Sequence, residues 1–264
     1  MAGLRVLPGR CVLREGQVTG AGQGLPDRDA EMIRAARRAV AGWAEFPAGA
    51  DPRPLVVLGG PVLVSNGFAT GDAKLAFLRG VVEAGAGVPE EAVRPLRRPA
   101  GKTGPRPRGP LRVVAAERSE AEFATDRGHQ RLPAWRLEAA DTLGPIWVLA
   151  DEAQARCWSL PESASQERIG PRMLRSGTVG ADGRELAVEF TGGSDRLFRY
   201  DAEVVETRAA VCVVPLPRMS VRLAPGTAIT AEGHLRKVGV TLAERLGGRV
   251  LVNLDGTPVP VTPG

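Results

Sequence analysis

The sequence is poor in aromatic residues, histidine, cysteine and lysine. Its 264 residues include six Phe, one Tyr, four Trp, two His, three Cys and three Lys. The cysteines form no Cys-x-x-Cys pair and have no histidine at ligand spacing, which argues strongly against a structural zinc site. With two histidines, acid–base catalysis has few candidate residues. We expect neither a metal nor a cofactor.

Long apolar runs are also missing. No segment approaches the roughly 18 apolar residues that a membrane span requires. The first twenty residues lack the hydrophobic core of a signal peptide and already carry Arg5, Arg10 and Arg14. We therefore expect no membrane span. As the sequence stands we expect a cytoplasmic protein, and an extracytoplasmic one if a leader has been removed.

Positive charge is concentrated in one stretch of the chain. Residues 94–112 carry seven basic residues and no acidic one, whereas the net charge of the whole chain is +5. The sequence has 32 Arg against three Lys together with much Ala, Gly, Val and Pro, as high-GC genomes produce, so arginine content says little about phosphate binding. No aromatic residue within the stretch could stack on bases. We interpret it as a solvated linker and do not expect nucleic acid as a partner.

Composition along the chain predicts the domain organisation. Residues 94–110 contain five prolines, which disfavour regular pairing, and are interpreted as a Pro/Arg-rich linker. Before it, residues 1–93 mix helical and strand patterns. After it, residues 111–264 follow a period of two and form a β-rich region, which a loop near 161–170 could split. The expected fold class is α+β, a mixed N-terminal domain followed by antiparallel strands.

Periodicity and capping residues predict individual elements. A helix is expected over 28–45 after the cap Asp27, and a second over 73–84 after the cap Asp72. A buried strand is expected over 54–58. Further strands are expected at 62–64, 111–115, 186–190, 199–205, 209–214, 238–242 and 250–252.

Three of the four tryptophans occur in a repeated Trp-x-Leu pattern. The tryptophans are Trp135, Trp147 and Trp158, each followed two residues later by a leucine. In a strand this spacing places each Trp and its Leu on the same face, which favours three core rings on one face of adjacent strands. The alternative is an exposed platform that stacks on a sugar or peptide, because exposed aromatic patches are usually binding sites.

The loop that precedes the first Trp-x-Leu holds the candidate catalytic residues. Asp126, Arg127 and His129 lie close together around Gly128. As a general base, His129 would require an orienting acid, either Asp126 or another acid brought near by folding, and a nucleophile. Arg127 is a candidate ligand-binding residue of the same loop. The simpler interpretation is an exposed loop without a catalytic role.

Cysteine usage leaves two interpretations open. In the first interpretation, the cysteines Cys11, Cys157 and Cys212 are buried free thiols. In the second, Cys157 and Cys212 form a disulfide, which would indicate an oxidising compartment.

Three segments resemble uncharacterised proteins predicted from actinobacterial genomes. They are the loop Gly67-Phe68 with Gly71-Asp72-Ala73-Lys74, the stretch from Thr125 to Leu149, and the tail from Thr241 to Val259. Some of those proteins begin with an export signal. The resemblance implies no activity and carries over no functional residue.

The sequence supports three functional hypotheses. The first is a non-catalytic binding or protein-interaction protein whose partner is another protein or a small molecule. The second is a hydrolase that uses the 125–131 loop. The third is a protein that binds an anionic polymer through residues 94–112.

Overall fold

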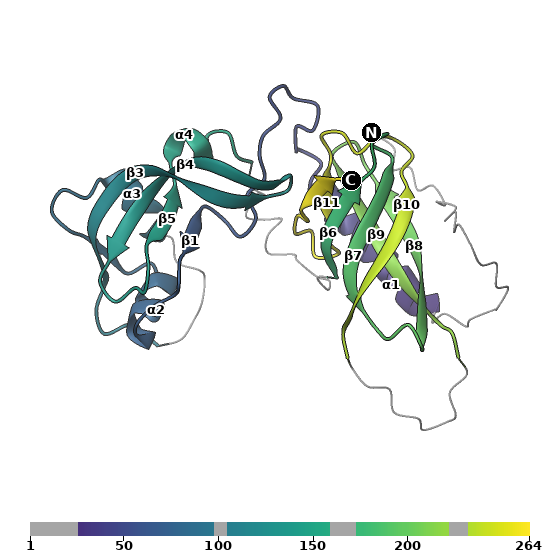
Figure 1. Ribbon diagram of the computed structural model, residues 1–264, viewed down its shortest axis with the longest axis horizontal. Coiled ribbons are helices and arrows are strands. Elements are labelled where there is room, and N and C mark those ends of the chain that lie inside the picture. The colour runs from purple at the N-terminus through teal and green to yellow at the C-terminus, as the bar shows by residue number, and fades with distance from the viewer. Residues whose placement is uncertain (1–25, 98–104, 159–172, 222–231) are drawn as a thin grey trace. The chain divides into compact units, whose positions relative to one another are not determined.

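The computed structural model describes residues 26–97, 105–158, 173–221 and 232–264 (Figure 1). Its α+β, β-rich architecture confirms the predicted fold class. The predicted split near 161–170 lies outside the described residues. None of the described helices is long and apolar enough to cross a membrane.

The chain forms two compact units, and each is made of non-contiguous segments. The first unit contains the described residues of 1–54, 126–128 and 159–264. The second contains those of 55–125 and 129–158. This division differs from the predicted one, in which residues 94–110 separate two domains. The reason is strand pairing, because Val82–Ala84 and Leu111–Val113 pair in parallel and join both sides of that stretch in one sheet.

In the first unit, two sheets enclose a hydrophobic core. A four-stranded sheet has the order β10-β7-β6-β12, and a three-stranded sheet has the order β11-β9-β8. Residues at alternate positions of both sheets form the core, including Phe190, Val204 and Val213. The strands are β6 (Leu174–Val179), β7 (Glu185–Gly192), β8 (Phe198–Glu206), β9 (Ala210–Met219), β10 (His234–Thr241), β11 (Val250–Val252) and β12 (Val261–Pro263).

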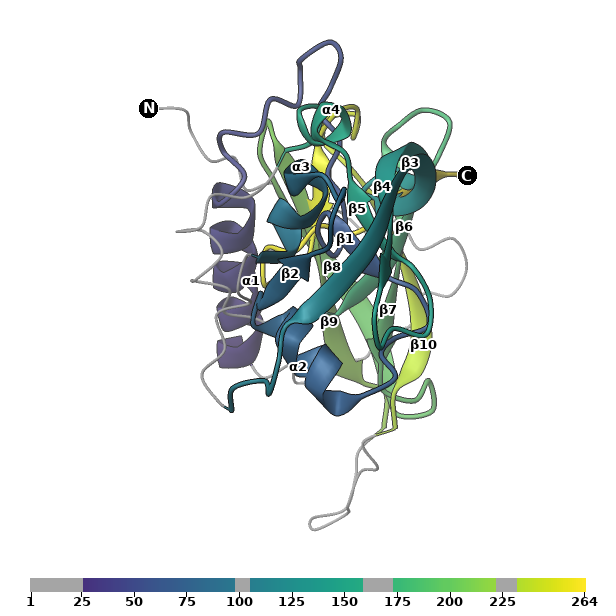
Figure 2. The ribbon, with the colours of Figure 1, turned by 90° about the vertical axis from the view of Figure 1, so that its left-hand side faces the viewer.

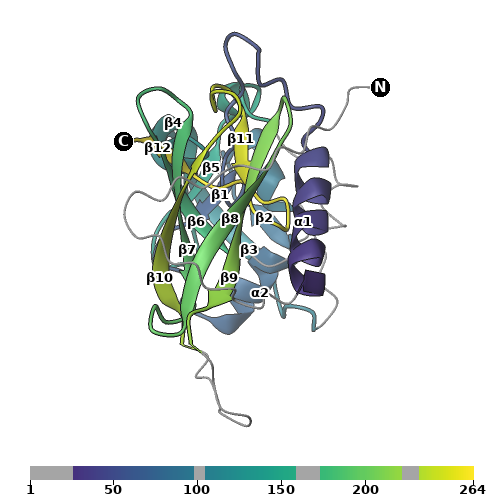
Figure 3. The same ribbon diagram turned by 90° about the vertical axis from the view of Figure 1, so that its right-hand side faces the viewer.

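Helix α1 (Pro26–Ala41) packs on β8 and β9 of the first unit (Figure 3). Proline is favoured in the first helical turn, where its missing N–H costs nothing. Met32, Ala36 and Val40 recur at helical spacing and are buried. β9 is buried on both faces, since Val211 and Val213 enter the core between the sheets while the alternating residues face the other way. The helix ends four residues before its predicted end at 45.

In the second unit, one five-stranded sheet has the order β1-β5-β4-β3-β2 (Figure 2). β5 pairs antiparallel with both β1 and β4. Its elements are β1 (Val62–Val64), α2 (Gly71–Leu78), β2 (Val82–Ala84), α3 (Glu90–Val93), the 3-10 helix η1 (Arg94–Arg97), β3 (Leu111–Thr125), β4 (Gly128–Ala139), β5 (Ile146–Leu149) and α4 (Asp151–Gln154). Of β4, Gly128 alone is grouped with the first unit.

The sheet of the second unit carries a core on each face. One core contains Trp135, Ile146 and Val148, and helices α2 and α3 contribute to it. The other contains Leu132, Ala134 and Leu149, with Trp147 packed against it. Successive residues of β4 and β5 therefore enter opposite cores, as strand geometry requires.

Several local predictions are corrected. The helix expected over 73–84 is α2, which ends at Leu78, and Gly80 then takes a φ of 66° before β2 begins. The side chain of Thr70, not Asp72, accepts the hydrogen bond from Ala73 N at 3.1 Å and caps α2. The strand expected over 54–58 forms only isolated bridges at Leu55 and Val57.

The predicted linker is also partly corrected. Its start forms η1, where Leu96 is buried in the core that contains Trp135. Residues 98–104 lie outside the described part of the chain. The linker interpretation failed at Leu96 because proline-rich composition does not prevent a single apolar residue from anchoring a short helix.

Candidate functional site

The three tryptophans of the Trp-x-Leu pattern occupy different environments. Trp135 and Leu137 lie in one core of the second unit, while Trp147 and Leu149 belong to the other. Each Trp thus shares a face with its Leu, but the two pairs face in opposite directions. The register explains this, because Trp147 lies opposite Arg136 and Trp135 lies opposite Val148. The prediction that all three rings share one face is wrong.

The remaining tryptophan lies outside the strands. Trp158 follows β5 and α4, and its backbone N–H donates to Leu55 O at 2.8 Å. Its side chain is half-buried. Trp135 is 9% exposed, and the guanidinium carbon of Arg118 lies 4.7 Å from the centre of its ring. Of the predicted aromatic candidates, Trp147 lines a hollow.

The Trp147 hollow, as we call it, has a volume of about 430 Å³. That volume lies within the usual range for small-molecule sites, about 300–1,000 Å³. Its lining includes both apolar and charged residues. The lining residues are Leu63, Ser65, Glu120, Ala121, Glu122, Arg131 and Trp147. Because β1, β3, β4 and β5 all contribute, most of these side chains stand on paired strands, which hold a site more rigidly than loops do.

The two glutamates of the lining, Glu120 and Glu122, each pair with a basic residue of β4. His129 Nδ1 lies 2.5 Å from Glu122 Oε1. Arg131 Nε lies 3.8 Å from Glu120 Oε2, a looser contact. All four side chains are more than half exposed. Such exposed pairs contribute only about 0–1 kcal/mol to stability, so a ligand could displace them at little cost.

The structure separates the two predicted catalytic residues. Asp126 is 1% exposed and belongs to the first unit, whereas His129 is exposed and belongs to the second. The carboxylate of Asp126 accepts hydrogen bonds from the Arg53 guanidinium. The acid beside His129 is Glu122, which the sequence reading did not single out. Two residues that are close in sequence therefore serve different units.

Arg127 is bonded to backbone oxygens of the first unit. Its Nη2 donates to Gly247 O at 2.6 Å and to Arg249 O at 2.8 Å. Burial lowers the pKa of Arg127, and the neighbouring Arg53 lowers it further, while the Asp126 carboxylate opposes both effects. These contacts make Arg127 a residue that fixes the loop, and they occupy donors that a ligand would need.

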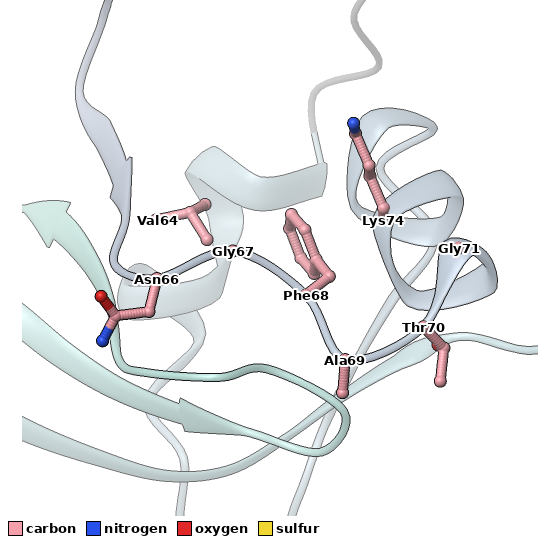
Figure 4. Close-up of a pocket in the computed structure, with 8 residues that line it drawn as sticks. All are labelled: Val64, Asn66, Gly67, Phe68, Ala69, Thr70, Gly71 and Lys74. Carbon is pink, nitrogen blue, oxygen red and sulfur yellow. The ribbon is translucent and has the colours of Figure 1, made fainter.

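A second hollow, of about 450 Å³, lies beside the loop that leads into α2 (Figure 4). Phe68 lies between Val64 and Lys74 there. Its polar side chains, Asn66, Thr70 and Lys74, are all exposed, and Thr70 already caps the helix. Since one loop and one short helix supply nearly all of its lining, it is less constrained than the Trp147 hollow.

The cysteines and potential metal ligands offer no competing site within the described residues. Cys157 and Cys212 are both free, which corrects the alternative of a disulfide between them. Burial raises the pKa of both thiols, and at Cys212 the charge of Asp255 adds to that increase. In the described part of the chain, no three His, Cys, Asp or Glu residues gather as metal ligands. Cys11 lies outside the described residues.

The sequence reading found Trp147 but missed the rest of the hollow's lining. A usable signal was present, because the acids of Glu120-Ala121-Glu122 and the basic side chains of His129-Gln130-Arg131 flank the loop at Asp126. Comparisons with protein-family models, curated proteins and solved structures find no match to the chain. The actinobacterial resemblance therefore stays a prediction, and the functional argument rests on the geometry of the hollow.

Proposed function

We propose that the protein is a non-catalytic binding protein and that the Trp147 hollow is its ligand site. The observation that supports this most directly is a half-buried tryptophan among the residues that line a hollow built mainly from strands. An aromatic ring offers a large contact area at a low cost in conformational entropy, and the surrounding polar groups orient the ligand. The ligand class is a small molecule or a single side chain of a partner protein.

Magnetic resonance of the tryptophan indoles tests this proposal on the full chain. The Trp147 Nε1–H signal is assigned by its loss in Trp147→Phe. We expect at least one of glucose, benzoate, choline and glycyl-leucine to shift that signal saturably, at millimolar concentration. The Trp135 signal is the internal control, because that ring lies in the opposite core. A Trp147 signal that none of the four probes moves would overturn the proposal.

One observation favours the hydrolase alternative. The 2.5 Å contact between His129 and Glu122 is the arrangement of a general base with its orienting acid. Ser65 lines the same hollow as Glu122, yet the described residues show no hydrogen bond between Ser65 and His129. In the described part of the chain, Ser65 is therefore not positioned as a nucleophile for His129.

The rate of ester hydrolysis distinguishes the binding function from the hydrolase alternative. We expect wild type, Ser65→Ala and His129→Ala to hydrolyse p-nitrophenyl acetate at the same slow rate. Glu138→Gln serves as a surface control, since Glu138 pairs with Arg136 and does not line the hollow. A loss of at least about 100-fold in both Ser65→Ala and His129→Ala, the lower end of the usual contribution of general acid–base catalysis, would contradict the non-catalytic assignment.

A further inference from the structure

We propose that Asn66 is a site of spontaneous deamidation, at which a neutral side chain is converted into a carboxylate. The sequence contains two asparagines, Asn66 and Asn253, and a glycine follows only the first. The proposal does not depend on the proposed function, because it concerns a reaction of the chain with itself and with water.

The reaction needs no group beyond Asn66, Gly67 and water. The backbone nitrogen of Gly67 gives up its proton and bonds to Asn66 Cγ, while the bond from Cγ to Nδ2 breaks and the side-chain nitrogen leaves as ammonia. Water then opens the resulting succinimide ring at either carbonyl. Opening at one carbonyl gives aspartate, and opening at the other gives isoaspartate, in which the main chain runs through the side-chain carbons.

The local structure leaves the reacting groups accessible. Asn66 is exposed, and its side chain points away from Phe68 and Lys74 (Figure 4). Among the described residues, none forms a hydrogen bond with this side chain or with the peptide group that joins Asn66 to Gly67. Because glycine lacks a Cβ, its nitrogen can approach Cγ closely. A Cβ on Gly67 would meet no described atom within 4 Å, so the space around the attacking residue is open.

Asn253 has the opposite surroundings within the same chain. Its side chain is 4% exposed, and a leucine follows it. Its Oδ1 accepts hydrogen bonds from Met173 N at 3.0 Å and from Leu174 N at 2.7 Å, and its Nδ2 donates to Leu174 O at 3.2 Å. These bonds hold the carboxamide in place, so Asn253 can react only after the surrounding structure has opened.

Residue 66 lies in sequence between the linings of the two hollows. Ser65 lines the Trp147 hollow, whereas Asn66 and Gly67 line the other. Ser65 N donates to Pro145 O at 3.0 Å, and Gly67 O accepts from Leu143 N at 3.1 Å. Isoaspartate adds an atom to the main chain between these two hydrogen bonds, so they cannot both keep their geometry. Deamidation would therefore change the loop that borders both hollows.

The test follows both asparagines in the full chain by mass spectrometry of its peptides, after incubation in mildly alkaline buffer, which promotes loss of the proton from Gly67 N. We expect aspartate and isoaspartate to accumulate at residue 66 at least about tenfold faster than at residue 253, since Asn253 must first be released by local unfolding. The same incubation in urea gives the rate without folded structure. The native chain should keep at least about a tenth of the urea rate at Asn66. A suppression by folding that is as large at Asn66 as at Asn253 would overturn the proposal.

Two variants identify the reacting residues. Asn66→Gln should form almost no product at this position, because glutamine would have to close a larger ring. Gly67→Ala should react at least about tenfold more slowly, because its Cβ hinders the attack; this variant is measured in urea, so that its φ of 81° in the native chain does not affect the result. Equal rates in wild type and Gly67→Ala would also overturn the proposal. In the isoaspartate form, hydrogen exchange at Leu143 N should be faster than in the unmodified chain, and unchanged exchange would contradict the change in the loop.

Discussion

The first unit buries charged and polar side chains, whereas the second displays nearly all of its own at the surface. Asp126, Arg249, Asn253, Asp255 and Thr257 are all buried in the first unit. In the described part of the second unit, Thr125 is the one buried polar residue. A buried charge must keep its partners, because removing one leaves the other without compensation. An exposed charge is free to exchange its partner for a ligand.

Arg249 is an example of a buried charge in the first unit that must keep its partners. Its side chain is 7% exposed and its Nη1 lies 2.7 Å from Glu206 Oε2, while Nη2 donates to the backbone oxygens of Glu244 and Arg245. Glu206 Oε1 also accepts from Ala243 N at 2.8 Å. The pair thereby fixes the segment that follows β10. In the second unit, Arg94 and Asp151 form an ion pair whose two side chains are both more than half exposed.

The largest expected effect comes from breaking the buried pair. Glu206→Ala should lower the free energy of unfolding of the first unit by about 3–5 kcal/mol, because it leaves the Arg249 guanidinium buried without its carboxylate. Hydrogen exchange measured by mass spectrometry on the full chain localises the loss to β8–β11. The matched surface change is Asp151→Ala, which should cost about 0–1 kcal/mol in the second unit. Equal losses in the two variants would contradict the contrast between the units.

A pair of glycines tests how tightly the first unit is packed. A Cβ on Gly248 would lie 1.9 Å from Ala48 O, so the backbone must move in Gly248→Ala. We expect a loss of about 1–3 kcal/mol, the usual cost of overpacking. A Cβ on Gly239 in β10 would meet no described atom within 4 Å. Gly239→Ala should therefore be neutral in urea unfolding, and a cost as large as that of Gly248→Ala would show that packing is not the cause.

The smallest expected effect is a difference in chemical reactivity between the two described thiols, Cys157 and Cys212. Burial raises the pKa of Cys212 in the first unit and that of Cys157 in the second, where the side chain is only half-buried. Because the thiolate is the reactive form, iodoacetamide should label Cys157 slowly in the native protein and faster as the pH rises. Cys212 should react only after denaturation. Peptide mapping by mass spectrometry distinguishes the two sites, and native labelling of Cys212 would contradict its burial.

The fold class and most elements were predictable because they depend on local patterns. Period-two alternation placed the strands at Val62–Val64 and Glu185–Gly192 correctly or nearly so, and helical spacing placed α1. The predictions were wrong where pairing with a strand far away in the sequence determines the secondary structure. Val82–Ala84 continues the apolar pattern of α2, yet it pairs with β3 as a strand. Nothing near residue 82 in the sequence reveals that partner.

The site was less predictable for the same reason. Trp147 was a candidate because tryptophan is rare, but its neighbours Leu63, Glu120 and Arg131 come from three other strands. Which side chains meet depends on the registers of those strands, as Trp147 opposite Arg136 shows. The sequence also placed Asp126 beside His129, because the tight turn at Gly128, with a φ of 85°, cannot be seen from spacing alone.

The packing of α1 on β8 and β9 has a consequence for protein synthesis. The helix is among the first described elements to be made, and its partner strands come after the whole of the second unit. Domains generally fold as units while the chain is being made. The second unit, apart from the three residues at 126–128, can therefore be completed while Val40 and Trp43 still lack the surface that buries them. Of the described elements, α1 therefore gives a chaperone the longest opportunity to bind its apolar side during translation.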